Sequence, residues 1–235
     1  MSRFLALGAV LGTAKIAVAT VLDGALNREE LPARVDERLA EWAADMLALA
    51  DIQLSVSGRE HLGRSETFVV MSNHQSHFDV PVAYASIPGR LRMVGKTELF
   101  RIPVFGRAMR VAGFVEVNRG DRAQAVSALD GARAALGAGT NIWIAPEGTR
   151  SETGALGPFK KGGFHLALGA DARIVPVSID GTRDVLPAHS RAVKRGQAVR
   201  VVIGEPIDSR AFGSERLPEL MAAVRDAIAT HLPYA

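Results

Sequence analysis

The sequence predicts an α/β protein whose mixed, largely parallel sheet is flanked by helices and preceded by two N-terminal helices. Beyond residue 50, short apolar runs alternate with amphipathic stretches, as they do in βα units. Polar loops follow several of these runs, at the strand ends where α/β proteins place functional residues. With 235 residues the chain can bury a sizeable core. We therefore expect a membrane-associating helical pair over residues 1–50 and one α/β domain over residues 51–235.

The first 50 residues contain two different helical patterns. Phe4 to Leu22 is almost continuous Ala, Leu, Val and Ile, and it approaches the roughly 20 residues that cross a bilayer. Lys15 would lie deep in the hydrocarbon, at a cost of about 2.5–3.5 kcal/mol unless its ammonium group reaches the interface. Glu30 to Ala50 is amphipathic. A hairpin in one leaflet, a full span, a cleaved secretory signal and a core-packing helix all fit this pattern.

The remaining elements follow from residue periodicity. Apolar and polar residues alternate from Ile52 to Val56, which predicts a half-buried strand. Further strands are expected at Thr67–Met71, Arg92–Val94, Phe114–Val117, Asn141–Ile144, Ile174–Ile179 and Val199–Ile203. Helices are expected at Val80–Ile87, Ala123–Leu136 and Ser214–His231. Because strands and helices alternate, most strands should run parallel, with helices covering both faces.

Composition and charge narrow the class of protein. Hydrophobic residues make up 48% of the chain and charged residues 23%, which is typical of a globular protein. The chain has no cysteine, so disulfides and a cysteine nucleophile are excluded. The net charge of +3 is too small to imply a nucleic-acid partner, but it suits an anionic membrane surface. Six basic residues lie between Arg90 and Arg110, either as a solvated face or beside the site.

His74 and Asp79 lie in a segment that suits general-base catalysis on a hydroxyl. Five residues turn an ideal helix by roughly 500°, so the two side chains would be about 140° apart on a helix and meet only across a turn. A strand is expected to end before His74 and a helix to begin near Asp79. A carboxylate that binds one imidazole nitrogen prepares the other to accept a proton. This pair predicts an acyl-transfer enzyme.

The segment from Ala145 to Ser151 has the composition of an anion-binding loop. Gly148 lets the backbone approach a ligand, Thr149 adds a hydroxyl, and Arg150 supplies a planar, bidentate donor suited to phosphate. Glu147 would repel an anion. We expect it to orient Arg150, to accept a hydrogen bond from a hydroxyl, or to support His74.

These motifs, in this order, resemble the glycerolipid acyltransferase family from about Leu54 to Thr182. Four blocks carry the resemblance: Asn73-His74-x-Ser76-x-x-Asp79, Gly113-Phe114-Val115-Glu116-Val117-Asn118-Arg119, Pro146-Glu147-Gly148-Thr149-Arg150-Ser151 and Ile174-Val175-Pro176-Val177. The lysine-bearing segment Val94–Leu99 and Phe159-Lys160-Lys161-Gly162 also recur in that family. One departure is Ala145, because an aromatic residue usually precedes the proline.

The resemblance implies an enzyme that acylates the free sn-2 hydroxyl of 1-acyl-glycerol-3-phosphate and so makes phosphatidic acid for phospholipid synthesis. Acyl-CoA or acyl carrier protein would be the thioester donor, and no cofactor or metal is expected. His74 and Asp79 would be catalytic. Substrate-binding residues would be Asn73, Ser76, Lys96, Arg119, Glu147, Gly148, Thr149 and Arg150. The family often carries an N-terminal helix pair, which favours a peripheral or monotopic protein on the cytoplasmic face of the cell membrane.

Three other functions fit parts of the sequence. A related enzyme of the same family could act on a different lysolipid acceptor. His74, His77 and Asp79, with His165 as a fourth ligand, suggest a metal-dependent hydrolase, although the spacing lacks the helical His-Glu-x-x-His pattern. A noncatalytic lipid-binding or membrane-tethering module is the third. It leaves the combination of a base, its orienting acid and a phosphate loop unexplained.

Overall fold

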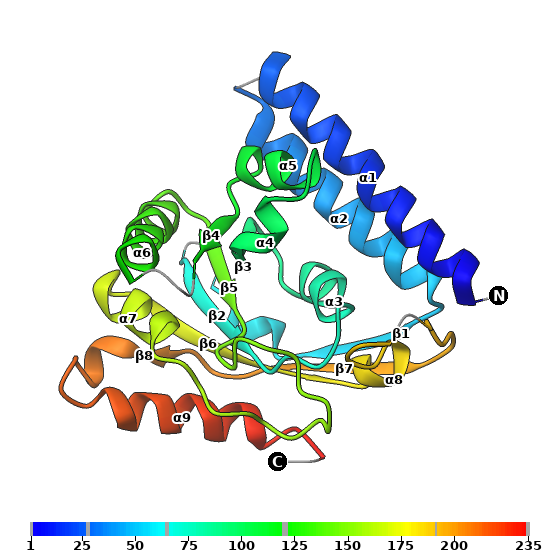
Figure 1. The fold of residues 1–235 in the computed structure, drawn as a ribbon. Helices are drawn as coiled ribbons and strands as arrows, with labels where there is room; N and C mark the ends of the chain where they lie inside the picture. Colours follow the sequence, from blue (N-terminus) through cyan, green and yellow to red (C-terminus); the bar gives the residue numbers. More distant parts are fainter. Residues whose placement is uncertain (1, 27–28, 64–65, 119–121, 191, 234–235) are drawn as a thin grey trace.

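The computed structural model describes residues 2–26, 29–63, 66–118, 122–190 and 192–233 (Figure 1). Its α-helices are α1 (Ser2–Leu26), α2 (Leu31–Leu49), α3 (Asp79–Ser86), α4 (Thr97–Phe100), α5 (Phe105–Val111), α6 (Arg122–Gly137), α7 (Gly162–Gly169), α8 (Thr182–Val185) and α9 (Leu217–Ala229). Its strands are β1 (Gln53–Ser57), β2 (Phe68–Ser72), β3 (Leu91–Lys96), β4 (Val115–Val117), β5 (Asn141–Ile144), β6 (Arg173–Asp180), β7 (Ala198–Ile203) and β8 (Ile207–Asp208). Short 3-10 turns lie at Arg59–His61 and Ser209–Ala211.

The strands form one sheet in the order β1-β7-β6-β2-β5-β3-β4, with β8 beside β6. Strands β2 to β6 run in the same direction, β7 and β8 run antiparallel to β6, and β1 is parallel to β7. The mixed, largely parallel sheet that we expected is therefore confirmed, as are all seven expected strands, whose ends shift by at most two residues.

Strand β2 occupies the centre of the sheet and positions the site. Val69 of β2 lies between Ile142 of β5 and Ile174 of β6. All five residues of β2 are buried, because strands flank it on both sides and helices cover both faces. Since β2, β3 and β5 are parallel, the loops that follow Ser72, Lys96 and Ile144 leave the sheet at one edge.

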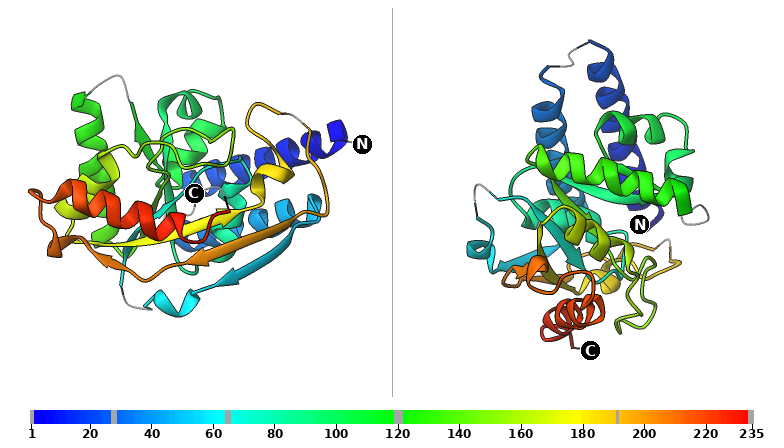
Figure 2. Two further views of the ribbon diagram at one scale, coloured as in Figure 1. Left: turned by 90° about the horizontal axis from the view of Figure 1, so that it is seen from below. Right: turned by 90° about the vertical axis from the view of Figure 1, so that its left-hand side faces the viewer.

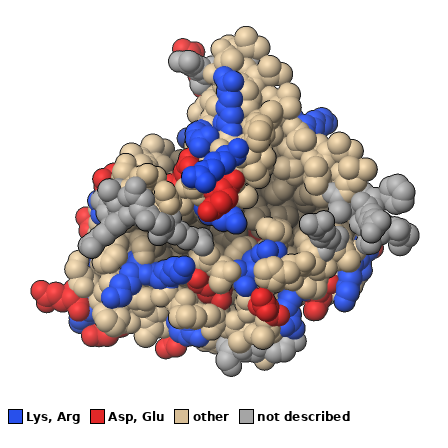
Figure 3. Space-filling model, viewed as in Figure 1, with Lys and Arg blue, Asp and Glu red and all other residues tan. Residues whose placement is uncertain are grey.

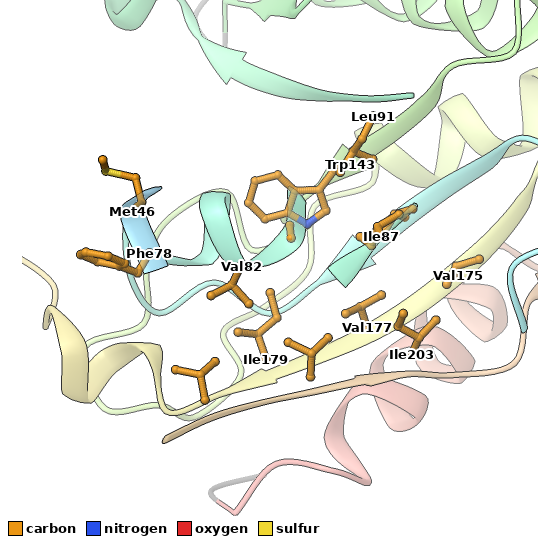
Figure 4. Packing of buried hydrophobic residues seen from close by; sticks show 14 of the residues in the cluster. Met46, Phe78, Val82, Ile87, Leu91, Trp143, Val175, Val177, Ile179 and Ile203 are labelled. Carbon is orange, nitrogen blue, oxygen red and sulfur yellow. The ribbon is translucent and has the colours of Figure 1, made fainter. Parts of the chain in front are cut away.

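Two hydrophobic cores lie on opposite faces of the sheet (Figures 1 and 2). On one face, Met46 of α2 and Val82 of α3 belong to the same cluster as Val177 of β6 (Figure 4). On the other face, Phe164 of α7 and Leu220 of α9 pack in a cluster with β2, β5 and β6. The second helix of the N-terminal pair therefore shares a core with the sheet.

Several short elements were not predicted from the sequence, and glycine explains two of them. Helix α5 contains Gly106, where a Cβ would lie 2.0 Å from the carbonyl oxygen of Phe100. Helix α7 begins with Gly162 and Gly163, and a Cβ at Gly163 would lie 3.1 Å from Met71. Close packing at these positions requires glycine, which has no Cβ. Because glycine is also a poor helix former, its presence hides the helical pattern in the sequence. Helices α4 and α8 and strand β8 are too short to show a period.

The terminal helix was predicted with boundaries that are too wide. It spans Leu217–Ala229 rather than Ser214–His231. Pro218 lies in its first turn, where proline needs no backbone donor, and residues before it form a turn. The other four predicted helices form at nearly the expected positions.

Helices α1 and α2 form a hairpin in which Thr13 and Asp23 of α1 face α2, whereas Lys15 is exposed. The indole N–H of Trp42 donates a hydrogen bond to Thr13 Oγ1 at 3.0 Å, and Arg38 forms an ion pair with the buried Asp23. The outward residues of α1 are large and apolar: Leu7, Val10, Leu11, Val18, Leu22 and Leu26 are between 47% and 76% exposed. This polarity is the reverse of that expected for a helix on the surface of a water-soluble protein.

Helix α1 also meets the requirements of length and composition for a membrane helix. Leu7–Leu26 has a mean hydropathy of 1.5, and only 17% of the apolar window within it is buried. Among the described residues, it is the one helix that is long and apolar enough to cross a bilayer.

We predict that the close contact between α1 and α5 is sensitive to volume. A Cβ at Gly24 would lie 2.5 Å from Val111 Cγ1, so Gly24→Leu should lower the free energy of unfolding by about 1–3 kcal/mol through overpacking. The neighbouring Ala25 is exposed, and Ala25→Leu should change that free energy by less than about 0.5 kcal/mol. Denaturant unfolding of both variants would measure the difference. Equal effects would refute the packing argument.

Candidate active site

His74 and Asp79 meet across the turn between β2 and α3. The Nδ1 atom of His74 lies 2.6 Å from Oδ2 of Asp79. Asp79 is the first residue of α3 and is fully buried, whereas the side chain of His74 is 21% exposed. With the Nδ1 proton donated to the carboxylate, the Nε2 lone pair is left available to a substrate. The predicted pairing of these residues is therefore present in the structure.

The carboxylate of Asp79 accepts four hydrogen bonds. Besides His74, Oδ2 accepts from the backbone N–H groups of Gln75 at 2.7 Å and Ser76 at 2.9 Å. Oδ1 accepts from the hydroxyl of Thr182 at 2.5 Å. Thr182 is completely buried at the start of α8. This network holds both oxygens of the carboxylate and fixes the direction in which it faces the imidazole.

Thr182 was missed by the sequence analysis. It lies 103 residues from Asp79 in the chain, and no local spacing connects the two positions. The available signal was the pair Gly181-Thr182 directly after β6, because Gly181 has φ 91° and turns the chain at the strand's carboxyl end. Polar residues at that position belong to the same edge of the sheet as His74.

Glu147 joins the two predicted loops. Its Oε1 accepts a hydrogen bond from the backbone N–H of His74 at 2.9 Å, and its Oε2 accepts from the N–H of Gly157 at 2.8 Å. The N–H of Ser151 donates to the carbonyl oxygen of His74 at 2.7 Å. Burial raises the pKa of Glu147, while the hydrogen bonds from Gly157 and His74 oppose this rise. The side chain thus supports His74, one of the three roles that we considered.

Three residues that we expected to bind substrate are instead committed to the protein's own backbone. Both polar atoms of the Asn73 side chain bond to the backbone of Ile179 at 2.8 Å. The hydroxyl of Ser76 donates to the carbonyl oxygen of Leu186 at 2.8 Å and accepts from the N–H of Phe78. Together with Glu147, these side chains are buried. We therefore revise their role from substrate binding to positioning of the His74 loop.

The indole ring of Trp143 packs against the imidazole ring of His74. The two rings meet edge to face, with centroids 6.3 Å apart and an angle of 87° between their planes. The indole N–H of Trp143 donates to Ser72 Oγ at 2.9 Å, which fixes the orientation of the indole. In Figure 4 the indole lies above the core residues of α3 and β6. This contact restricts the His74 ring by packing, because edge-to-face pairs are favourable.

Cationic side chains gather on the open side of the dyad. The pKa of His77 is lowered by desolvation first and then by the positive charges of Arg150 and Lys96, which lie close enough to act on it. Gly148 has φ 71°, and a Cβ there would lie 3.1 Å from the Nζ atom of Lys160. Figure 3 shows Lys and Arg side chains beside a hollow with largely uncharged walls. Lys96 and Arg150 thus act on His77, and the loop that carries Gly148 and Arg150 contacts His74 through the N–H of Ser151; their role in substrate binding stays a prediction.

Thr149 and Arg119 are the two other residues that we expected to bind substrate. Thr149 is exposed on the loop between Gly148 and Arg150, where its hydroxyl is accessible to a ligand. Arg119 lies outside the described residues. Lys160 belongs to the segment 159–162, for which we predicted no role, and its approach to Gly148 adds it to the cations that could bind a substrate.

The loop that carries Arg150 is held at its far side by α9. Arg225 of α9 donates to the carbonyl oxygens of Gly157 at 2.6 Å and Leu156 at 2.8 Å. Its guanidinium also lies over the ring of Phe159, 5.3 Å from the centroid. Because the N–H of Gly157 binds Glu147, a continuous series of contacts connects α9 to the backbone of His74. The sequence alone gave no indication of this support.

The arrangement does not suit the alternative of a metal-dependent hydrolase. Within the described residues, no cluster of three or more His, Asp or Glu side chains could hold a metal ion. Asp79 uses both oxygens in hydrogen bonds, and His74 uses Nδ1 to bind Asp79. His165 lies exposed on α7, in a different part of the fold from α3.

Comparison with known proteins connects this site to acyl transfer. A family model described as Acyltransferase matches residues 53–180. The chain is 37% identical over 153 residues to the chloroplastic 1-acyl-sn-glycerol-3-phosphate acyltransferase BAT2 of Brassica napus, covering 65% of this chain and 44% of that protein. It is 33% identical over 184 residues to the human 1-acyl-sn-glycerol-3-phosphate acyltransferase alpha, covering 77% and 64%. The chain thus spans less than half the length of the plant protein.

A solved structure matches almost the whole chain. The crystal structure of the 1-acyl-sn-glycerophosphate acyltransferase PlsC from Thermotoga maritima superimposes with a TM-score of 0.79 at 26% identity. The match covers 98% of this chain and 95% of that one, so it includes the N-terminal helices as well as the sheet.

We predict that Thr182 acts through Asp79. Thr182→Val should lower kcat about 10–100-fold with little change in KM, as expected when the partner of a catalytic side chain is lost. Thr182→Ser keeps the donor and should retain most of the turnover. Steady-state kinetics of acyl transfer from a thioester to a lysolipid would measure both, with unfolding midpoints as a check. A Thr182→Ser variant as impaired as Thr182→Val would rule out the hydrogen bond as the cause.

Proposed function

The chain belongs to the acyltransferase family, and from this membership we propose that it moves a fatty acyl group from a thioester to the sn-2 hydroxyl of 1-acyl-glycerol-3-phosphate. The product is phosphatidic acid. The observation that carries the proposal is the contact between His74 and Asp79 beside the Arg150 loop. One group removes a proton from an alcohol, and the neighbouring loop offers cations to a phosphate.

The proton transfer follows from the tautomer that Asp79 selects. Nδ1 of His74 is bound to the carboxylate, so Nε2 accepts the proton of the substrate hydroxyl. As the imidazole becomes imidazolium, the buried negative charge of Asp79 stabilises it at 2.6 Å. The edge of Trp143 and the fixed backbone around His74 limit rotation of the ring. The base is therefore oriented before the substrate arrives.

The acyl group passes directly from the thioester to the substrate hydroxyl, by addition and then elimination. The deprotonated hydroxyl oxygen attacks the thioester carbonyl carbon and forms a tetrahedral intermediate; the C–S bond then breaks, and the thiolate takes the proton from His74. A thiol titrates near 8.5, so a thiolate is a good leaving group and no acyl-enzyme is needed. Ser76 is buried and bonded to Leu186, which leaves it unsuited to act as a nucleophile. Acyl-CoA and acyl carrier protein both present such a thioester.

The acceptor phosphate lies against the cations around His77. Arg150 provides a bidentate donor, and Lys96 and Lys160 add ammonium groups. Burial first, and then the charges of Arg150 and Lys96, lower the pKa of His77, and this positive surrounding supports the binding of an anion here. The distance from phosphate to the sn-2 hydroxyl then directs that hydroxyl toward Nε2 of His74. Positioning of this kind is worth several orders of magnitude in rate.

The protein lies on the membrane with α1 in one leaflet. The outward face of α1 is apolar, whereas its inward face binds the amphipathic α2 through Thr13 and Asp23. A full span would carry charged residues of α2, such as Glu37 and Glu41, into the hydrocarbon at several kcal/mol. A helix parallel to the surface buries the same apolar residues without that cost. We place the site on the cytoplasmic leaflet, where it meets its lipid acceptor.

His74→Ala should lower turnover by about 10²–10⁴-fold, as expected for the loss of a general base. Binding of the lysophospholipid should change little, because the cations that bind its phosphate are retained. His165→Ala is the matched control, since this histidine is exposed on α7. Assays with radiolabelled thioester donors would measure turnover. Turnover that survives in His74→Ala would place the active centre elsewhere.

Binding of the acceptor should raise the pKa of His77. Burial, and secondarily the neighbouring positive charges, lower the pKa of His77; a bound phosphate would offset the charges, so the protonation midpoint should move to higher pH. Nuclear magnetic resonance titration with glycerol 3-phosphate would report the shift. Arg150→Gln should raise the pKa of His77 in the free protein and weaken phosphate binding by roughly tenfold or more. No shift on phosphate addition would refute this binding position.

A further inference from the structure

The exposed large apolar side chains of the described residues lie on only two elements. Six of them are on α1: Leu7, Val10, Leu11, Val18, Leu22 and Leu26. The other two are Ile102 and Val104, which are 47% and 48% exposed in the segment between α4 and α5. We name residues 101–104 the α4–α5 tip. A scattered apolar surface would need no explanation, but this distribution marks one region of the molecule.

The backbone of the tip directs Val104 outward at a cost in conformational energy. Val104 has φ 65° and ψ −56°, and the N–H of Phe105 donates to the carbonyl oxygen of Pro103 at 2.7 Å. These values define a γ-turn, a rare and strained conformation for a residue with a branched Cβ. Glycine would adopt it without strain. A strained valine with an exposed side chain suggests that the side chain has a partner outside the protein.

The tip and α1 belong to one surface. Val111 at the end of α5 lies against Gly24 of α1, and the two helices are in contact. Figure 1 shows α5 beside α1, on the side of the molecule away from α9. The apolar residues of α1 recur at three- and four-residue steps, so they share one side of that helix. Because the tip leads directly into α5, its apolar side chains lie beside the helix that packs against α1.

The charges around this surface match an anionic membrane. Arg101 within the tip, Arg107 on α5 and Lys15 on α1 are all exposed. Basic residues beside apolar side chains that reach the acyl region are attracted by anionic headgroups. An acidic protein could use the arginines, but it would leave the apolar face of α1 uncovered. A lipid bilayer covers both.

We propose that the α4–α5 tip is a second membrane-inserting element, which acts with α1 to fix how the enzyme sits on an anionic bilayer. This inference rests on the membrane location given under the proposed function and adds a second point of contact. One helix alone leaves rotation about its axis free, whereas a second point removes that freedom. Lys96 directly precedes α4, so insertion of the tip also holds the phosphate-binding lysine at the lipid surface.

The test compares binding of the full-length chain to vesicles of phosphatidylcholine, with or without phosphatidylglycerol. Ile102→Ser with Val104→Gly should weaken the partition coefficient by roughly tenfold or more, from the apolar area withdrawn from the bilayer. Val104→Gly alone should leave the unfolding temperature unchanged or raise it, because the strain is relieved. Arg101→Gln with Arg107→Gln should weaken binding to the anionic vesicles only.

Control variants come from α9, on the opposite side of the molecule (Figure 1). Ala222→Ser on α9 and Arg216→Gln directly before it change exposed residues and should leave partitioning unchanged. Turnover of the tip variants on a soluble short-chain substrate in detergent should equal that of the wild type. Wild-type partitioning by the apolar tip variant would overturn the proposal. If the wild-type chain itself fails to bind vesicles, the membrane location fails instead. Loss of activity only with an acidic carrier-protein donor would assign the tip to that donor and overturn the lipid assignment.

Discussion

The buried carboxylate of Asp79 is the constraint on which the site depends. A charge without access to water is tolerated only when donors surround it, and here four donors come from His74, the following two residues and Thr182. These donors belong to a loop after β2 and a helix after β6, so the central strands must align before the charge is satisfied. The same interactions that make the charge tolerable also aim it at the imidazole.

The polar residues near the dyad divide into two groups by what they touch. Asn73, Ser76 and Glu147 bind backbone groups and hold two loops against each other, whereas Lys96 is exposed and Arg150 half-buried. Rigid support on one side and accessible cations on the other is the arrangement that a preorganised site requires. The carboxylate of Glu147 therefore does not oppose the proposed binding of a phosphate by its loop, because it is buried and binds backbone N–H groups of the protein.

Sequence patterns predicted the strands, the long helices and the central pair, because each depends on local periodicity or on short spacing. The spacing of five residues indicated that His74 and Asp79 could meet only across a turn and not along a helix, and the structure places them in such a turn. The partners Thr182 and Arg225 were not predictable in this way, since they lie 103 residues from Asp79 and 68 from Gly157. Similarly, Asn73 and Glu147 are polar residues whose buried position depends on contacts that only tertiary structure creates.

The attachment of α9 to the Arg150 loop has a consequence for the order of events during synthesis. The carbonyl groups of Leu156 and Gly157 find their donor in Arg225, which the ribosome adds well after the loop itself. Helices α1 and α2, by contrast, both precede the sheet in the chain. Their hairpin can thus form while the candidate site is still incomplete, because the support from Arg225 is available only once α9 has been synthesised. The full set of contacts behind His74 therefore requires that α9 has packed against the sheet.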